Sequence, residues 1–266
     1  MNGILKVELW RAFHNQRFLI VLALTLACLG VGWYRAEAIV TQQQIHPVNL
    51  LMMILSYTPF ATLAALLATL PFADSFLDDK NNGFLRFIAL RTSYRRYLTA
   101  KGLAVGLAGG ASIAASLILM LGILILSGKA DFSAHNYLST STFAPFEPWG
   151  PLGWLYSLNP YYYLGFLLIS AFLFGGIYAL MGLAISTLVN NRYIALAAPL
   201  LFFHIFAYLE TRSLRLLPAW NPAYALYPFE AIDGFTLANW GGQYALLLFG
   251  STLCIMLLAR RARINF

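Results

Sequence analysis

The stretch "GFLLISAFLFGGIYALMGLAI", residues 165–185, contains no charged residue and shows no alternation of apolar and polar positions. A helix needs about 20 mainly apolar residues to cross the ~30 Å hydrocarbon layer of a bilayer. The other structure that can span a bilayer, a closed β-barrel, is built from strands of about ten residues with alternating hydrophobicity. The stretch therefore predicts a membrane-spanning helix.

The whole chain has the composition of a membrane protein. Of its 266 residues, 60% are hydrophobic and 10% are charged, and the mean hydropathy is +0.70. Charged residues make up about 25% of an ordinary soluble domain. Six segments are long and apolar enough to span the bilayer, namely 18–34, 48–73, 102–127, 161–189, 193–210 and 241–259. We therefore predict an all-α integral membrane protein with six transmembrane helices, forming one transmembrane domain over residues 1–266.

The distribution of lysine and arginine predicts the orientation. Thirteen of these residues lie in the N-terminal segment, in the connections between spans 2 and 3 and between spans 4 and 5, and at the C-terminus, against four in the remaining connections. Cytoplasmic loops carry the excess of positive charge. We expect a multi-pass protein of the cell membrane with both termini in the cytoplasm. The net charge of +7 then reflects topology and attraction to anionic lipid, and no nucleic-acid partner is expected.

Residues 1–17 predict an amphipathic helix in the headgroup region. Apolar residues at helical spacing alternate with polar ones in "MNGILKVELWRAFHNQR": Leu5, Leu9 or Trp10, and Phe13 against Lys6, Arg11, Asn15 and Arg17. An amphipathic helix with this pattern lies in the membrane interface. The alternative is a simple cytoplasmic extension of the first span.

Two connections, 128–160 and 211–240, are expected on the outer side. Each contains an Asn-Pro pair followed by tyrosine, and Pro218, Pro222 and Pro228 prevent a continuous helix between spans 5 and 6. We predict a broken outer segment there. The functional interpretation is an outer gate, and its candidates are Tyr161, Tyr224, Tyr227 and Phe229. The alternative is an aromatic belt that anchors helix ends.

The third span begins with small residues on one helix face. Gly102, Gly106 and Gly110 are four residues apart, a spacing that lets two helices approach closely in lipid. The partner is either a second subunit or a neighbouring span. No metal site is predicted, because the four histidines and two cysteines lack ligand spacing. His204 is expected to hydrogen-bond a neighbouring helix, the alternative being a functional group within the membrane.

The connection 74–101 is the most charged part of the chain, with nine of its 27 charged residues. An acidic turn ending in Asn-Asn-Gly precedes a short amphipathic helix, and Thr92 or Ser93 can cap the third span. We predict a cytoplasmic docking helix rather than a basic loop that only fixes topology. Its candidate docking residues are Asp78, Asp79, Gly83, Phe84, Leu85, Arg86, Phe87, Ile88, Arg91, Arg95 and Arg96.

This connection resembles the segment between helices 2 and 3 of ABC-2 type transporter permeases, the membrane subunits of type V ABC exporters. The family pattern has acidic residues, a glycine, an apolar run, a turn and a lysine entering helix 3. The matching segments here are Asp78–Asp79, Gly83-Phe84-Leu85, the run 87–90, the turn 91–94, and Lys101. Two residues differ from the family: Arg91 stands where a proline is usual, and Tyr94 where a basic residue is usual.

The resemblance implies a transport function. The short helix would be a coupling helix that docks on a separate cytoplasmic ATPase, because this chain contains no phosphate-binding loop of the Gly-x4-Gly-Lys-Ser/Thr type. ATP and Mg²⁺ would bind the ATPase, and this chain would hold no cofactor and have no enzymatic activity alone. A second permease subunit, identical or related, would complete a pathway that exports a hydrophobic, lipid-like or peptide cargo across a bacterial plasma membrane.

Two other classes stay open. One is a channel or a non-catalytic assembly factor for another membrane complex. The other is a polytopic membrane enzyme, which would need ionisable groups that converge inside the bilayer. Asp74 and Glu210 lie at span ends on opposite sides of the predicted membrane, and His204 has no evident partner in the sequence.

Overall fold

The computed structural model describes residues 2–39, 46–85, 87, 93–128, 150–212, 220–230 and 235–262. Within these residues the chain is all-helical and contains no strand. The helices are α1 (Asn2–Phe13), α2 (Gln16–Ile39), α3 (Pro47–Tyr57), α4 (Phe60–Thr69), α5 (Ser75–Asn81), α7 (Tyr94–Leu126), α8 (Trp154–Leu158), α9 (Pro160–Leu188), α10 (Arg192–Arg212), α11 (Pro222–Leu226) and α12 (Leu237–Ala262).

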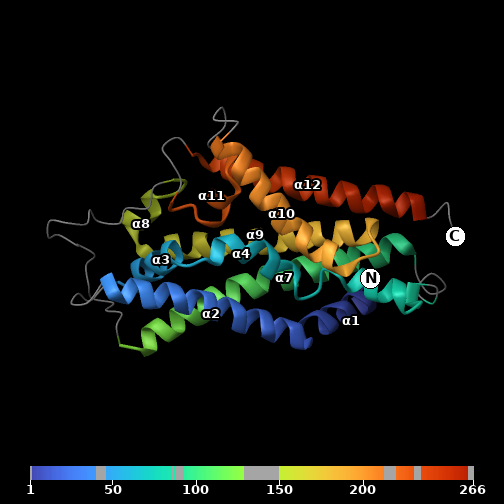
Figure 1. Ribbon diagram of the computed structural model, residues 1–266, viewed down its shortest axis with the longest axis horizontal. Coiled ribbons are helices and arrows are strands. Elements are labelled where there is room, and N and C mark those ends of the chain that lie inside the picture. The colour runs from blue at the N-terminus through green and yellow to red at the C-terminus, as the bar shows by residue number, and fades with distance from the viewer. Residues whose placement is uncertain are drawn as a thin grey trace.

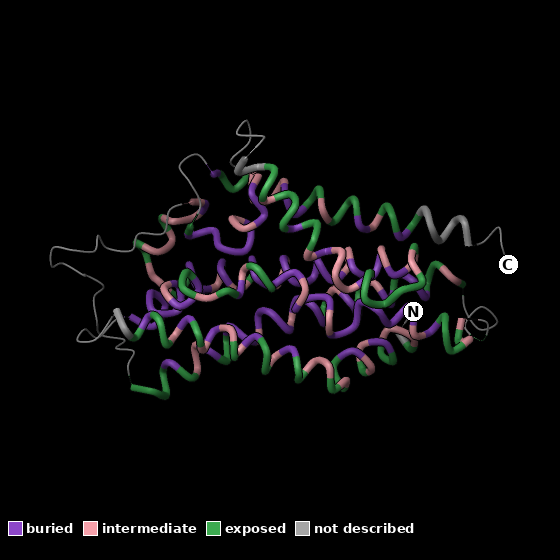
Figure 2. Tube along the Cα trace, viewed as in Figure 1, coloured by how far each residue is buried: buried purple, intermediate pink, exposed green. Residues whose placement is uncertain are grey.

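Two long helices, α7 and α9, form the centre of an elongated bundle (Figures 1 and 2). The helices α1 and α2 pack on α7, while α4, α10 and α12 pack on α9. The tightest approach is between α7 and α9, where a Cβ atom added to Gly109 or Gly175 would lie 2.8 or 2.5 Å from the other's carbonyl oxygen. The predicted small-residue face therefore packs within the chain. Its Gly110 meets the Phe172 backbone on α9, and Gly106 lies so near α9 that a Cβ atom added to Gly176 would be 3.0 Å from the Gly106 carbonyl oxygen. Gly102 meets only the Leu180 side chain, at 3.7 Å from an added Cβ atom.

Several helices are long and apolar enough to cross a membrane. They are Gln16–Glu37, Tyr94–Leu126, Pro160–Leu188 and Arg192–Leu209, with α3 and α4 as a fifth candidate if the bent pair is one span. Among the described residues α12, which covers the predicted sixth span, does not join this set. The finding is compatible with a multi-pass membrane protein.

The predicted single helix over 48–73 is wrong. Two helices, α3 and α4, replace it and meet at a bend of 89°. The cause is Pro59, which lacks a backbone N–H and whose ring clashes with the carbonyl four residues earlier in a continuous helix. Thr58, in extended conformation between the two helices, donates a hydrogen bond from Oγ1 to the Cys28 carbonyl oxygen over 2.6 Å. The break is thus tied to α2.

Apolar side chains are abundant on the outer surface of the bundle. Leu19 on α2, Ile118 on α7 and Phe249 on α12 are each more than half exposed. Several of the fully buried positions, by contrast, are serine or threonine, such as Ser112 and Ser170. Large exposed apolar patches are rare in soluble monomers, and small polar residues at helix interfaces are typical in lipid. This surface is the one expected of helices that contact a bilayer.

The N-terminal helix α1 is separate from α2. The chain leaves the helical path at His14 and Asn15, and the Asn15 side chain accepts a hydrogen bond from the Arg17 backbone N–H over 3.1 Å. On α1 the charged Glu8 is buried while Trp10 is 63% exposed. The charged side of α1 therefore faces the other helices, and the interfacial position expected for residues 1–17 stays a prediction.

Candidate functional site

The charged connection 74–101 lies at the end of the bundle where α1, α5 and the first turns of α7 meet. Eight charged side chains from α1, α2, the 74–81 segment, α7 and α10 form two linked ion clusters there. The inner cluster contains Glu8, Arg11, Asp79 and Lys101, and the outer cluster contains Arg17, Asp74, Asp78 and Arg192.

In the inner cluster the side chains of Glu8, Asp79 and Lys101 are all buried. Lys101 is fully buried on α7; its ammonium bonds Asp79 and lies 3.1 Å from Glu8 Oε2. Arg11 donates to Asp79 Oδ1 over 2.9 Å and to Glu8 Oε1 over 3.2 Å. The Tyr97 hydroxyl donates to Asp79 Oδ2 over 2.6 Å. Two positive and two negative charges therefore cancel within the cluster, which meets the need of buried charges for partners.

The electrostatics of Asp79 follow from these contacts. Burial alone would raise the pKa of its carboxyl group, but the charge of Lys101 and the hydrogen bonds from Arg11, Lys101 and Tyr97 outweigh burial. The net effect lowers the pKa of Asp79 below its ordinary value. Burial would lower the pKa of Arg11, but the hydrogen bond and charge of Asp79 raise it. The pair is therefore ionised at neutral pH.

The outer cluster joins three more elements. Asp74 is fully buried immediately before α5, and Arg17 NH1 lies 2.8 Å from both of its carboxylate oxygens. Arg192, at the start of α10, donates to Asp74 Oδ2 over 2.7 Å. Asp78 lies 3.8 Å from Arg17 and is 40% exposed. This cluster is also neutral overall, and it holds α2 and α10 against the start of the connection.

The predicted docking residues separate into three groups. Asp79 does not lie at the surface, because it is the centre of the inner cluster. Arg86, Ile88 and Arg91 lie outside the described residues. The remaining residues lie at or near the surface: Asp78, Gly83, Phe84, Leu85, Phe87, Arg95 and Arg96.

Within the surface group, an aromatic pair is the main feature. Phe84 is 55% and Phe87 is 64% exposed, and their rings lie 6.4 Å apart at 66°. Leu85 faces the other way and packs on a core cluster that includes Phe76 and Tyr97. The segment starts at Gly83, which has the left-handed φ of +69° that glycine adopts at no steric cost. The sequence predicts one apolar face of Phe84, Leu85 and Ile88, with Phe87 beside it. In the structure Leu85 anchors the segment, and Phe84 and Phe87 project from it.

The predicted outer gate residues occupy two different places. Tyr227 and Phe229 are buried, stacked 5.5 Å apart, and Tyr227 lies 6.4 Å from Phe60 at the start of α4. Tyr161 is 41% exposed and lies 5.2 Å from the ring of His46. Tyr224 lies against Phe235 at 5.8 Å. The short helix α11, whose first residue Pro222 follows the capping Asn221, breaks the chain where the prolines predict a break.

Sequence reasoning missed much of the ion network. The sequence interpretation treats Arg17 and Arg192 as topology signals and Asp74 as a residue at a span end, and it gives Glu8 no role. In the structure Arg17 and Arg192 pair with Asp74, and Glu8 pairs with Lys101. One signal in the sequence could have indicated the network. The chain has only 10 acidic residues, and an acidic residue at the end of a span needs a cation as its partner. The ring of His204 lies 2.9 Å from the Thr62 carbonyl oxygen of α4, in agreement with the expected contact between helices.

No protein-family model and no curated protein sequence matches this chain. Among the described residues, no group of three or more His, Cys, Asp or Glu side chains could hold a metal ion.

Proposed function

We propose that this chain is the membrane subunit of an ATP-driven exporter of the ABC-2 permease type, and that segment 74–101 docks on a separate ATPase. The observation that carries the proposal is the exposed pair of Phe84 and Phe87 on a short segment fixed at a charged end of the bundle. Buried aromatic anchors dominate protein–protein interfaces. Burying a phenylalanine contributes about 1.5–3 kcal/mol, so two exposed rings are a strong anchor for a partner.

The ion clusters supply a way to transmit movement of the docking segment. Asp79 on α5 is held by Arg11 of α1 and Lys101 of α7, and Asp74 is held by Arg17 of α2 and Arg192 of α10. Separating the two buried carboxylates from their cations would cost free energy, because each carboxylate is held by two of these groups. A force applied to the segment therefore moves these helices together.

The proposed arrangement in the membrane follows the charge distribution. Six spans, with α12 as the sixth, would place both termini and the docking segment in the cytoplasm of a bacterial cell membrane. In the structure, α5 and the C-terminal end of α12 lie toward the same end of the bundle (Figure 1), as this topology requires. ATP and Mg²⁺ would be bound by the ATPase, and a second permease subunit would complete the pathway for a hydrophobic cargo.

The enzyme alternative is less well supported. The eight ionisable groups of the two clusters are paired with one another, which favours a structural role for them over that of an acid, a base or a nucleophile. A channel or assembly factor would have no use for a phosphate-loop ATPase. The gene next to this one is therefore informative: an ATPase encoded there favours the permease, and its absence favours the channel or assembly factor.

Co-purification tests the docking segment. We expect the Phe84→Ser/Phe87→Ser variant, expressed with the neighbouring ATPase, to lose the ATPase on purification in detergent, with binding weakened about 100-fold or more. The matched control is Trp154→Ser/Tyr162→Ser, which removes two aromatic side chains that are 60% and 62% exposed near α8. Full retention of the ATPase by the Phe84/Phe87 variant would refute docking through this pair.

A further inference from the structure

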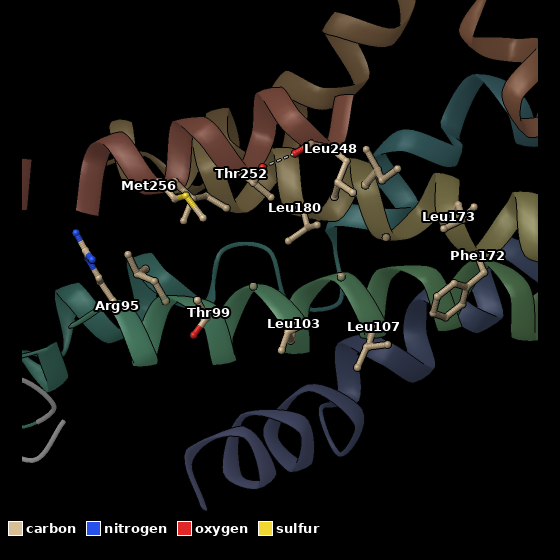
Figure 3. A pocket seen from close by; sticks show the side chains of 16 residues that line it. Arg95, Thr99, Leu103, Leu107, Phe172, Leu173, Leu180, Leu248, Thr252 and Met256 are labelled. Carbon is tan, nitrogen blue, oxygen red and sulfur yellow. Dashed lines mark hydrogen bonds between the residues drawn. The ribbon is translucent and has the colours of Figure 1, made fainter. Parts of the chain in front are cut away.

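An apolar groove of about 670 Å³ lies between α7, α9 and α12. Figure 3 shows Arg95 and Met256 at one end of this groove and Phe172 and Leu173 at the other. The groove exists because α7 carries glycine at positions 102 and 106, where the nearest side chain to an added Cβ atom would be that of Leu180. It is a separate feature from the ion clusters, which lie on the other side of α7.

The chemistry of the lining is almost entirely apolar. Of the sixteen lining residues only Arg95, Thr99 and Thr252 have polar side chains. The Thr99 hydroxyl donates to the Arg96 carbonyl oxygen, and the Thr252 hydroxyl to the Leu248 carbonyl oxygen, so both are satisfied within their own helices. The interior therefore offers no free polar group to a ligand, and a flexible hydrocarbon chain suits it.

One end of the groove is cationic. Arg95 is exposed, and its guanidinium has no ion pair or hydrogen bond among the described residues. Arg11, Arg17 and Arg192 at this end are paired with carboxylates, whereas Arg96 is exposed like Arg95 but does not line the groove. An unpaired guanidinium at the mouth of an apolar groove complements an anionic headgroup joined to an acyl chain.

The length of the groove matches one leaflet. On α7 the lining runs from Arg95 to Leu107, and twelve residues of helix rise about 18 Å. One leaflet of hydrocarbon is half of ~30 Å. Arg95 and Thr99 precede the apolar part of α7, so the cationic end lies at headgroup depth and the Phe172 end near the middle of the bilayer. Leu103 and Met256 are 50% and 62% exposed, which leaves the groove open to lipid along its side.

We propose that this groove is a binding site for one anionic phospholipid, with an acyl chain along Gly102 and Gly106 and the headgroup at Arg95. The site shares Arg95 with the segment proposed to dock on an ATPase, but it is formed by α7, α9 and α12 and needs no second protein. The proposed topology decides only in which leaflet the groove lies, and it places the groove in the cytoplasmic leaflet. A lipid suits this groove better than a protein helix. A helix with its side chains is about 10–12 Å wide, a single acyl chain is narrower, and α7 and α9 close the groove at Gly109 and Gly175.

Lipid titration followed by native mass spectrometry tests the proposal. Protein in mild detergent is titrated with micelles of phosphatidylglycerol or phosphatidylcholine that carry the same acyl chains, and bound lipid is counted. We expect one tightly held phosphatidylglycerol. Arg95→Gln should weaken its binding about fivefold and leave phosphatidylcholine unchanged. Arg96→Gln, which alters an equally exposed neighbour that does not line the groove, should change neither.

A second pair of variants tests the acyl chain. Gly102→Leu fills the groove without a close contact for its Cβ atom, and should weaken both lipids at least about tenfold. Gly122→Leu is the control on the same helix, since nothing lies within 4 Å of its added Cβ atom and it does not line the groove. If Gly102→Leu lowers the helix content, Thr252→Phe fills the groove from a partly exposed position on α12.

Three results would overturn the proposal. Equal losses for Arg95→Gln and Arg96→Gln would indicate a general surface charge effect. Tight lipid retained by both groove-filling variants would place the lipid elsewhere. Conversion of a dimer to a monomer by Gly102→Leu, measured by light scattering, with lipid binding unchanged, would make the groove an interface between two copies. None of these results depends on the ATPase.

Discussion

The two ends of the bundle bury polar groups with different chemistry. Around α5, eight charged side chains cancel in two neutral clusters. Around α11, uncharged groups share hydrogen bonds: the Tyr244 hydroxyl lies 2.8 Å from the carbonyl oxygens of Ser170 and Ala225, and Trp240 Nε1 donates to Ser170 Oγ over 2.9 Å. Both networks join several helices, but the network around α5 buries ionised groups, whereas the network around α11 buries neutral ones.

The difference predicts how each end responds to change. Removing one member of a buried charge pair leaves its partner uncompensated, which costs about 3–5 kcal/mol, whereas the net contribution of a neutral hydrogen bond is about 1 kcal/mol. The charged end also responds to pH, and the neutral end does not. Such a charged end suits a segment that must move as a unit with its neighbours, as in the proposed docking on an ATPase.

The largest effect is expected at Lys101. Lys101→Met leaves Asp79 and Glu8 buried with Arg11 as their remaining cation and should lower the free energy of unfolding by about 3–5 kcal/mol. Thermal or denaturant unfolding of the purified protein in detergent measures this loss. Arg96→Met, at an exposed cation on the same helix that does not line the groove, should have little effect. Adding Asp79→Asn to Lys101→Met should recover part of the stability, and a purely additive double variant would contradict charge pairing.

A smaller effect is expected at Asp74. Asp74→Asn weakens charge-assisted bonds to Arg17 and Arg192, but both guanidiniums are more than a third exposed and can turn to water. The expected loss in the free energy of unfolding is about 1.5–3 kcal/mol. Asp78→Asn is the matched control, because Asp78 is 40% exposed and 3.8 Å from Arg17, and it should cost less than about 1 kcal/mol. Equal losses in the two variants would mean that the burial of Asp74 has no energetic importance.

The neutral end should give a still smaller effect. Tyr244→Phe removes a hydroxyl that lies between two buried carbonyl oxygens and should lower the free energy of unfolding by about 1–1.5 kcal/mol, with no dependence on pH. Tyr162→Phe, on an exposed tyrosine of the same helix as Ser170, is the control. A loss as large as that of Lys101→Met would remove the distinction between the two ends.

The sequence predicted the class of fold, because length and continuous apolarity decide whether a helix can span a bilayer. The predicted spans 102–127 and 161–189 match the C-terminal end of α7 and both ends of α9 to within one residue, and the Asn-Asn-Gly composition predicts the polar turn at Gly83. The apolar run 48–73 is long enough for one spanning helix, and this length suggests a single helix although Pro59 lies inside the run; the structure has α3 and α4 there instead. A local chemical signal for that break was present.

The charge network could not be predicted, because its partners are far apart in the sequence. Arg17 and Asp74 are 57 residues apart, and Arg192 and Asp74 are 118 apart. No spacing rule connects them, since their proximity results from the packing of α2 and α10 against the same turn. The segment around Gly83 shows the same limit. Its periodicity indicates one apolar face, but only packing decides that Leu85 turns inward while Phe84 and Phe87 stay exposed.

The smallest effect is the pH dependence of the Lys101→Met penalty. In the native protein the lowered pKa of Asp79 stabilises the fold above its unfolded value of about 4, and this contribution disappears as the pH falls through the lowered pKa. In Lys101→Met the largest of the groups that lower this pKa is gone, so burial should raise it. A raised carboxyl pKa adds stability to the variant as the pH falls. The difference in the free energy of unfolding between variant and native protein should therefore be smaller at pH 5 than at pH 8, and histidine titration cancels in that difference. A penalty that stays constant from pH 8 to pH 5 would mean that Arg11 and Tyr97 alone keep Asp79 ionised.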